Sequence, residues 1–316
     1  MSSEYASALN AMEYLIVRET CRLCGAEGEL QESHIVPAFV FRWLKDTSAT
    51  GYLRFGQVPN RRVQDGPTRR WLCATCEQRF NVWETRFATE MFHPLNADGG
   101  RFCQYRDWLL KFCASISWRN LVRARDDTEL NDLSADQMSS VDRALSVWSE
   151  FVLGRVPHPG KFQQHLLPLD TVDGYSAGRL PANINRYILR TVEMDVIHSP
   201  DATFTFSKIG KFIVLGFIDI TFPNQWVNTR VHVREGIIRP SRYTVPRQFG
   251  DYLLERTDRL AAVHSEISAT QRDKISQTMM RDLDRLSTSD SLKAMEHDVE
   301  LSGDEAFKIH QGKANS

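Results

Sequence analysis

The chain has 316 residues, 42% of them hydrophobic and 25% charged, which is the composition of a folded globular protein and excludes wholesale disorder. Its 39 Lys and Arg residues against 40 Asp and Glu residues leave a net charge of −1, which excludes a uniformly basic nucleic-acid-coating protein but allows a local basic face. The length is comfortable for two compact units.

The first 20 residues predict a short helix rather than a targeting segment. Glu4, Glu13 and Arg18 interrupt the apolar stretch, so it lacks the composition of a signal peptide. No apolar run in the chain approaches the roughly 20 residues that span a bilayer. We therefore expect a cytoplasmic protein with no membrane partner.

Four of the six cysteines form two C-x-x-C pairs, Cys21 with Cys24 and Cys73 with Cys76. A disulfide framework is not expected in a chain without an export signal. Two such pairs can supply four thiolates to one tetrahedral Zn²⁺, and Gly25, directly after the first pair, suits the tight turn that aims both sulfurs inward. The spacing therefore predicts a structural zinc site. The alternative is a set of unrelated buried cysteines.

The segments around the second pair predict the rest of a zinc module over residues 1–95. Residues 37–45 predict a short amphipathic helix with Pro in its first turn. Residues 47–67 are rich in turn-forming residues and predict a hairpin or a long loop. Beyond Cys76, large apolar residues recur at helical spacing as far as Met91, so the second pair is expected to open a helix.

Residues 96–286 predict a domain of helices and an antiparallel β-meander. Helices are expected over residues 103–125, 141–153, 248–264 and 269–286, and strands over residues 187–197, 203–206, 212–222 and 229–233. Cys103 and Cys113 are expected to be buried, unreactive thiols of the first of these helices. Residues 287–316 are acidic and nearly free of aromatic residues, so they predict a mobile tail.

A histidine-centred segment lies between the two cysteine pairs. The sequence Cys21-Arg-Leu-Cys24-Gly25, then Ser33-His34-Ile35-Val36-Pro37, then Cys73-Ala-Thr-Cys76-Glu77 resembles the HNH endonuclease superfamily in its zinc-bound, treble-clef-like ββα-metal branch. The resemblance covers about residues 18–90. It implies an α+β protein in which a treble-clef-like zinc module precedes the helical and antiparallel β-sheet domain.

The resemblance also implies the roles of individual residues. His34 would be the general base that activates water. Ser33 and Glu77 fall at the two positions that hold a catalytic Mg²⁺ or Mn²⁺. Asn81 and Glu84 lie one and two turns after Glu77 on the same helical face and could complete the metal shell or bind a phosphate.

This chain departs from the family pattern at Ser33, at Glu77, which stands where His or Asn is usual, and in the loop between the two cysteine pairs. Ser33 is a neutral hydroxyl where an acid is usual, although hard cations prefer carboxylate oxygens. Glu32 is one residue away and would face the opposite side of a strand unless a bulge re-aims it. Asn60 is the available counterpart of the family's middle asparagine, in a loop that is longer than usual.

Basic residues are concentrated in the same part of the chain. Residues 42–86 contain nine Lys or Arg residues and four Asp or Glu residues, an excess of five positive charges. Arginine side chains reach phosphate oxygens readily, so we expect DNA as a partner. The candidate DNA-binding residues are Arg61, Arg62, Arg69, Arg70 and Arg79. The alternative is a solvated basic face without a partner.

Two functions follow from these patterns. The resemblance implies a metal-dependent endonuclease that hydrolyses DNA phosphodiester bonds, in a family with members in restriction and anti-phage defence. The alternative is a non-catalytic zinc module that binds nucleic acid or a protein partner, with His34 packed against the zinc knuckle and Glu77 an ordinary acidic residue at a helix start. The domain after residue 95 could carry recognition of a protein partner or self-association.

Overall fold

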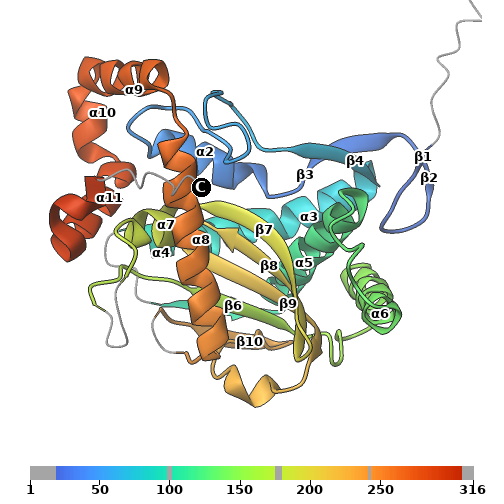
Figure 1. Cartoon of the computed structure of the whole chain (residues 1–316). Helices are drawn as coiled ribbons and strands as arrows, with labels where there is room; N and C mark the ends of the chain where they lie inside the picture. The colour runs from blue at the N-terminus through green and yellow to red at the C-terminus, as the bar shows by residue number, and fades with distance from the viewer. Residues whose placement is uncertain (1–18, 98–101, 175–179, 241–242, 308–316) are drawn as a thin grey trace, which may run out of the picture.

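The computed structural model describes residues 19–97, 102–174, 180–240 and 243–307, and it combines helices with four small β-sheets (Figure 1). The predicted helix of residues 1–20 lies almost entirely outside the described residues. The largest sheet has four antiparallel strands. In spatial order they are β6 (Gln164–Pro168), β9 (Phe212–Ile220), β8 (Ala202–Ile209) and β7 (Val192–His198).

Side chains of the central strand β9 alternate between two apolar layers, as the period of two requires. Phe212, Val214 and Ile218 join the cluster that contains α5 (Trp108–Asp126), whereas Ile213, Leu215 and Phe217 join the cluster on the opposite face. Gly216 lets α5 approach the sheet, since a Cβ atom there would lie 2.5 Å from Ser117 Oγ. The sheet is therefore buried on both faces.

The first part of the chain forms two short antiparallel ribbons and two helices. Strands β1 (Glu19–Thr20) and β2 (Glu27–Gly28) pair around the first cysteine pair, and β3 (Leu30–His34) pairs with β4 (Thr68–Cys73). Helix α2 (Ala38–Asp46) follows β3, close to the predicted residues 37–45. Helix α3 (Ala74–Phe87) starts within the second cysteine pair, and a π-helical turn (Ala88–Phe92) and α4 (His93–Asn96) extend it.

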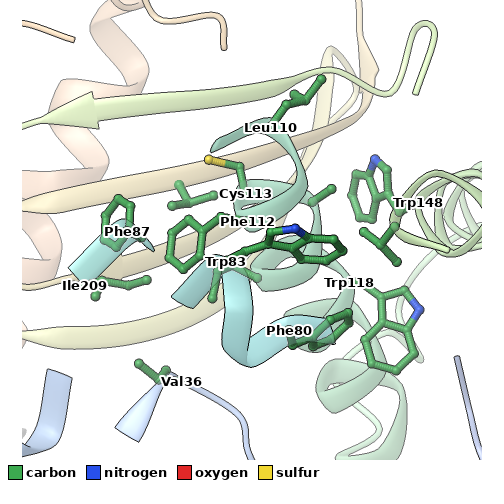
Figure 2. Packing of buried hydrophobic residues seen from close by; sticks show 14 of the residues in the cluster. Val36, Phe80, Trp83, Phe87, Leu110, Phe112, Cys113, Trp118, Trp148 and Ile209 are labelled. Carbon is green, nitrogen blue, oxygen red and sulfur yellow. The ribbon is translucent and has the colours of Figure 1, made fainter. Parts of the chain in front are cut away.

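One hydrophobic core crosses the predicted boundary near residue 95. Phe87 of α3 stacks on Phe112 of α5 with ring centroids 4.0 Å apart, and Phe80 meets Trp118 edge to face at 5.9 Å. Figure 2 shows these side chains of α3 and α5 interleaved. The candidate site is consequently built on a helix that is packed into the larger core rather than on an isolated module.

The C-terminal arm, α8 to α11, returns to the first part of the chain. Helix α8 (Arg247–Ser265) crosses the sheet on the face opposite α5, and the arm continues toward α2 (Figure 1). Its remaining helices are α9 (Ala269–Arg281), α10 (Leu283–Thr288) and α11 (Asp290–Ser302). Contacts with the end of α2 include Arg285 Nε donating to Ser48 O at 2.8 Å and Asp290 N donating to Thr47 O at 2.9 Å.

Several predicted elements differ from the structure. Residues 187–197 do not form one strand: α7 (Ile184–Arg190) precedes β7, and its apolar residues Ile184, Tyr187 and Ile188 follow helical spacing. Residues 103–125 contain a strand, β5 (Cys103–Arg106), before α5. That strand pairs with β10 (Glu235–Ile238). The sequence pattern predicted neither β10 nor β6.

Two further segments of the structure differ from the elements predicted for them. Residues 229–233 make one isolated bridge, between Arg230 and His165, instead of a strand. Helix α6 (Ala135–Val152) starts earlier than predicted, at a capping box in which Ser134 and Gln137 exchange hydrogen bonds.

The predicted mobile tail is helical as far as Phe307. Asp298 of α11 is fully buried and accepts hydrogen bonds from Asn185 N (2.6 Å), Arg186 N (3.2 Å) and Arg186 Nε (2.7 Å) in the first turn of α7. The Asp298 carboxylate accepts hydrogen bonds from backbone N–H groups that are otherwise free at the N-terminus of α7. This acidic segment is therefore a helix docked on α7.

Candidate metal centre and adjoining polar site

The four predicted cysteine ligands lie together. The sulfur atoms of Cys21, Cys24, Cys73 and Cys76 are all within 4.8 Å of one another, and Cys24 Sγ is 3.9 Å from Cys73 Sγ. A tetrahedral ion with metal–sulfur distances of about 2.3 Å requires sulfur–sulfur distances of about 3.8 Å. The donor set and its spacing therefore fit a metal ion such as zinc.

Two local structures aim these sulfurs at one point. Gly25 adopts φ +76°, and its N–H donates to Cys21 O at 2.9 Å, which closes the turn of the first pair. Cys73 is the N-cap of α3, and Cys76 lies in its first turn. The β3–β4 ribbon joins the two pairs, since Leu30 faces Cys73 in its register.

Electrostatics at the cluster favour a thiolate at Cys21. Burial raises the pKa of this thiol, but backbone N–H groups, first of Cys24 and then of Cys73 and Leu23, outweigh it and lower the pKa to about 7. For Cys76, burial and the neighbouring Cys21 sulfur raise the pKa. Four thiols this close repel as anions, and a bound dication would relieve that repulsion.

The two other cysteines are buried away from the cluster, as predicted. Cys113 is fully buried in α5, and Cys103 is 7% exposed in β5. Burial raises the pKa of both thiols, which is typical of unreactive cysteines.

The structure brings together Ser33 and Glu77, 44 residues apart. Ser33 Oγ donates a 2.6 Å hydrogen bond to Glu77 Oε2, which links the end of β3 to the first turn of α3. The register of β3 and β4 shifts between Gln31 and Glu32, so that Leu30 and Ser33 both point inward. This bulge leaves Glu32 exposed and does not turn it toward Glu77.

His34 has a partner that the sequence reading missed. Its Nε2 lies 3.2 Å from Asp65 Oδ2, and the side chain of His34 is 25% exposed. Partial burial raises the pKa of Asp65, but the N–H of Gly66 and the neighbouring His34 outweigh it, so this pKa is below its ordinary value. The Asp65-Gly66-Pro67 turn signal was visible in the sequence, but it did not indicate which side chain the acid would meet.

The other polar candidates lie elsewhere or have other partners. Asn81 is exposed on α3. Glu84 forms an ion pair with Arg119, which is 1% exposed and stacks 4.7 Å from the Phe80 ring. Asn60 is hydrogen-bonded to the turn between α8 and α9, donating to Glu266 O at 3.0 Å and accepting from Ser268 N at 2.8 Å.

The five candidate DNA-binding arginines fall into two groups. Arg61 and Arg62 are exposed on the 47–67 loop, and Arg62 lies 4.2 Å from the Tyr52 ring.

The other three have partners within the protein. Arg69 lies 3.4 Å from Asp127, and Arg70 lies 3.0 Å from Glu19. Arg79 is half-buried and donates to Leu153 O at 3.1 Å, at the C-terminus of α6.

Comparisons of the chain with protein-family models, with curated proteins and with solved structures find no match. None of the described helices combines the length and apolar character needed to cross a membrane. The chemistry of the site therefore rests on its own geometry.

Proposed function

We propose that this protein is a metal-dependent endonuclease of the HNH type, with a treble-clef-like module that holds a structural zinc ion and with DNA as its substrate. The observation that carries the proposal is the 2.6 Å contact between Ser33 and Glu77, beside His34. The HNH pattern requires the residue before the histidine and the first residues of the following helix to lie together. The contact between Ser33 and Glu77 meets this requirement although the two residues are 44 positions apart in the sequence, and this supports the assignment.

Zinc accounts for the architecture around this contact. A bound dication explains why four thiols converge at one point. It would hold β3, β4 and the start of α3 in one arrangement. Ser33 and Glu77 lie on these same elements.

The chain's own residues supply the proton chemistry. The side chain of His34 is 25% exposed, so water can reach part of the imidazole, although Nε2 itself is buried and has no hydrogen-bond partner among the described residues. An imidazole placed in this way can accept the proton of the attacking water. Arg61 and Arg62 on the neighbouring loop are available to bind phosphate oxygens.

A divalent cation would be held by Glu77, with Ser33 or Asn81 as an additional oxygen donor. Carboxylate, hydroxyl and amide oxygens suit hard cations such as Mg²⁺ and Mn²⁺, which retain several water ligands in such sites. When bound, the ion supplies charge neutralisation at the scissile phosphate.

The test is DNA cleavage by the zinc-loaded protein with Mg²⁺, Mn²⁺ or Ni²⁺. His34→Ala and Glu77→Gln should each abolish cleavage while zinc content, melting temperature and DNA binding are retained. His198→Ala and Glu90→Gln are matched controls that change exposed residues elsewhere and should leave cleavage intact.

One rival function is favoured by specific observations. A hydroxyl replaces the usual acid at Ser33, and Arg69, Arg70 and Arg79 already have partners within the protein. These features suit a non-catalytic zinc module that binds nucleic acid or a protein partner. Failure of the wild-type protein to cleave with any of the three cations, with DNA binding intact, would favour this rival.

A further inference from the structure

A cavity of about 270 Å³ lies between the loop of residues 153–163, which follows α6, and the segment of residues 226–234, which precedes β10. Three of its lining residues are buried and apolar, namely Leu110 in the first turn of α5, Pro159 and Val231. Sites for drug-sized molecules have volumes of roughly 300–1,000 Å³. This cavity is slightly smaller, so it suits a small ligand.

The polar side chains of the cavity offer hydrogen-bond donors. His158, Gln163 and Arg230 line it, and no Asp or Glu among the described residues does so. Nδ1 of His158 accepts a 3.2 Å hydrogen bond from Gly160 N, so the proton of the neutral ring is on Nε2. The side-chain amide of Gln163 has no hydrogen-bond partner in the described part of the chain. These groups are therefore free to donate to a ligand.

The backbone of Arg230 is fixed against β6. The hydrogen bonds on its two sides run from Leu166 N to Thr229 O and from Val231 N to Gln164 O, and both are 2.9 Å long. The guanidinium consequently extends from an anchored backbone, which reduces the conformational entropy that is lost when the side chain binds a ligand.

The positive charge of Arg230 is not neutralised by an acid. Arg230 forms no ion pair with another described residue, whereas Arg155, in the same loop as His158, lies 2.8 Å from Glu150. Burial, and after it the charge of Arg230, lowers the pKa of the neighbouring His165 to about 3. A guanidinium without a counter-charge attracts anions, and its planar set of donors matches the oxygens of a phosphate group.

We infer that this cavity binds the phosphate group of a small phosphorylated ligand, with Arg230, His158 and Gln163 as its donors. A free mononucleotide and the phosphodiester of a nucleic acid share this chemistry. No residue of the cavity belongs to β3, β4, α2, α3 or residues 47–67. The site is therefore separate from the proposed nuclease site and does not depend on that function.

The test is isothermal titration calorimetry on the full-length, zinc-loaded protein without added divalent cations. Inorganic phosphate and adenosine 5′-monophosphate should each bind at one saturable site. Arg230→Gln should weaken both affinities about 10- to 100-fold, as expected for the loss of hydrogen bonds to a charged group. The melting temperature without ligand should not change, because the Arg230 side chain is exposed and has no ion pair among the described residues.

Two matched variants and one competing anion serve as controls. Arg239→Gln removes the same charge from an exposed residue outside the cavity and should bind phosphate as the wild type does. Glu77→Gln should also retain phosphate binding, since Glu77 lies in the other site. Acetate at equal concentration should not displace phosphate. Three results would overturn the inference: no saturable binding to the wild type, wild-type affinity in Arg230→Gln, or equal displacement by acetate, which would indicate an adventitious ion only.

A dinucleoside monophosphate of thymidine, which has only an internal phosphodiester, distinguishes the two sources of the phosphate. Binding of adenosine 5′-monophosphate alone, with loss in Arg230→Gln, would support the site and identify a free mononucleotide. Binding of both compounds, with the same loss, would support the site and identify a nucleic-acid backbone. If the wild type cleaves no DNA, the proposed function fails, whereas the phosphate site is decided by these titrations.

Discussion

Ser33 Oγ and Glu77 Oε2 are joined by a 2.6 Å hydrogen bond that connects the end of β3 to the first turn of α3. Ser33 is fully buried, so Glu77 meets a neutral hydroxyl in a place where water has little access. One oxygen of the Glu77 carboxylate therefore has a hydrogen-bond donor supplied by the protein itself.

This relationship predicts the behaviour of Ser33→Asp. The variant places two carboxylates against each other in a poorly hydrated site, which should lower the free energy of unfolding by ~3 kcal/mol without divalent cations. Mg²⁺ or Mn²⁺ should raise the melting temperature of Ser33→Asp by several degrees more than that of the wild type. Ser33→Asn is the neutral control, and an equal response of all three proteins to cations would contradict a cation site at Glu77.

Removal of one cluster cysteine should remove the metal. Cys73→Ser is expected to lose the zinc ion and to lower the free energy of unfolding by several kcal/mol, because metal binding stabilises only the folded arrangement. Metal content measured by mass spectrometry and thermal denaturation check this prediction. Cys103→Ala and Cys113→Ala, which also change buried cysteines, should keep one zinc ion per chain; zinc loss in either would argue against the four-cysteine site.

The ion pair between Glu84 and Arg119 should be costly to break. Glu84→Gln leaves the guanidinium of Arg119 buried without its counter-charge, which should lower the free energy of unfolding by about 3–5 kcal/mol. Urea denaturation measures the change. Glu90→Gln removes an exposed ion pair with Arg86 and should lower the free energy of unfolding by about 0.3–0.5 kcal/mol. Equal losses of unfolding free energy in Glu84→Gln and Glu90→Gln would show that burial does not determine the strength of the Glu84–Arg119 pair.

Lys208 predicts a specific pH dependence of stability. Burial lowers its pKa to about 7, against a smaller opposing effect of Glu193, whereas the amine of the unfolded chain titrates near pH ~10.4. Between these values the unfolded state binds more protons, so this group makes the fold more stable as the pH rises and less stable as the pH falls toward 7.

The measurement is the free energy of unfolding across pH 7 to about 10 for the wild type and for Lys208→Met. The variant loses the donor to Ile188 O (2.7 Å) and should be less stable overall, but its stability should rise less steeply with pH. Parallel curves for the two proteins would show that Lys208 does not titrate in this range.

The sequence predicted those parts of the site that depend on short-range pattern. Two C-x-x-C pairs, a glycine after the first and a proline at the start of residues 37–45 act within a few residues, and the structure has the cysteine cluster and α2 where these signals indicated. The contact between Ser33 and Glu77 was anticipated through a resemblance rather than through spacing.

Other features depended on partners that no local pattern names. Glu84 and Arg79 lie on α3 as expected, yet Glu84 pairs with Arg119, 35 residues later in α5, and Arg79 donates to Leu153, 74 residues later at the end of α6. The composition of residues 287–316 predicts a mobile acidic tail, whereas Asp298 within it is buried at the start of α7.

The sequence by itself determined the metal-binding residue types, the helical and extended periodicities, and the basic character of residues 42–86. Only the tertiary structure decided that Asp65 meets His34, that a bulge turns Ser33 rather than Glu32 inward, and which charges are paired with one another. The physical reason is range: turns and helix starts follow from the few residues that form them, whereas burial and charge pairing follow from the collective packing of distant segments, whose free energy is a property of the whole core.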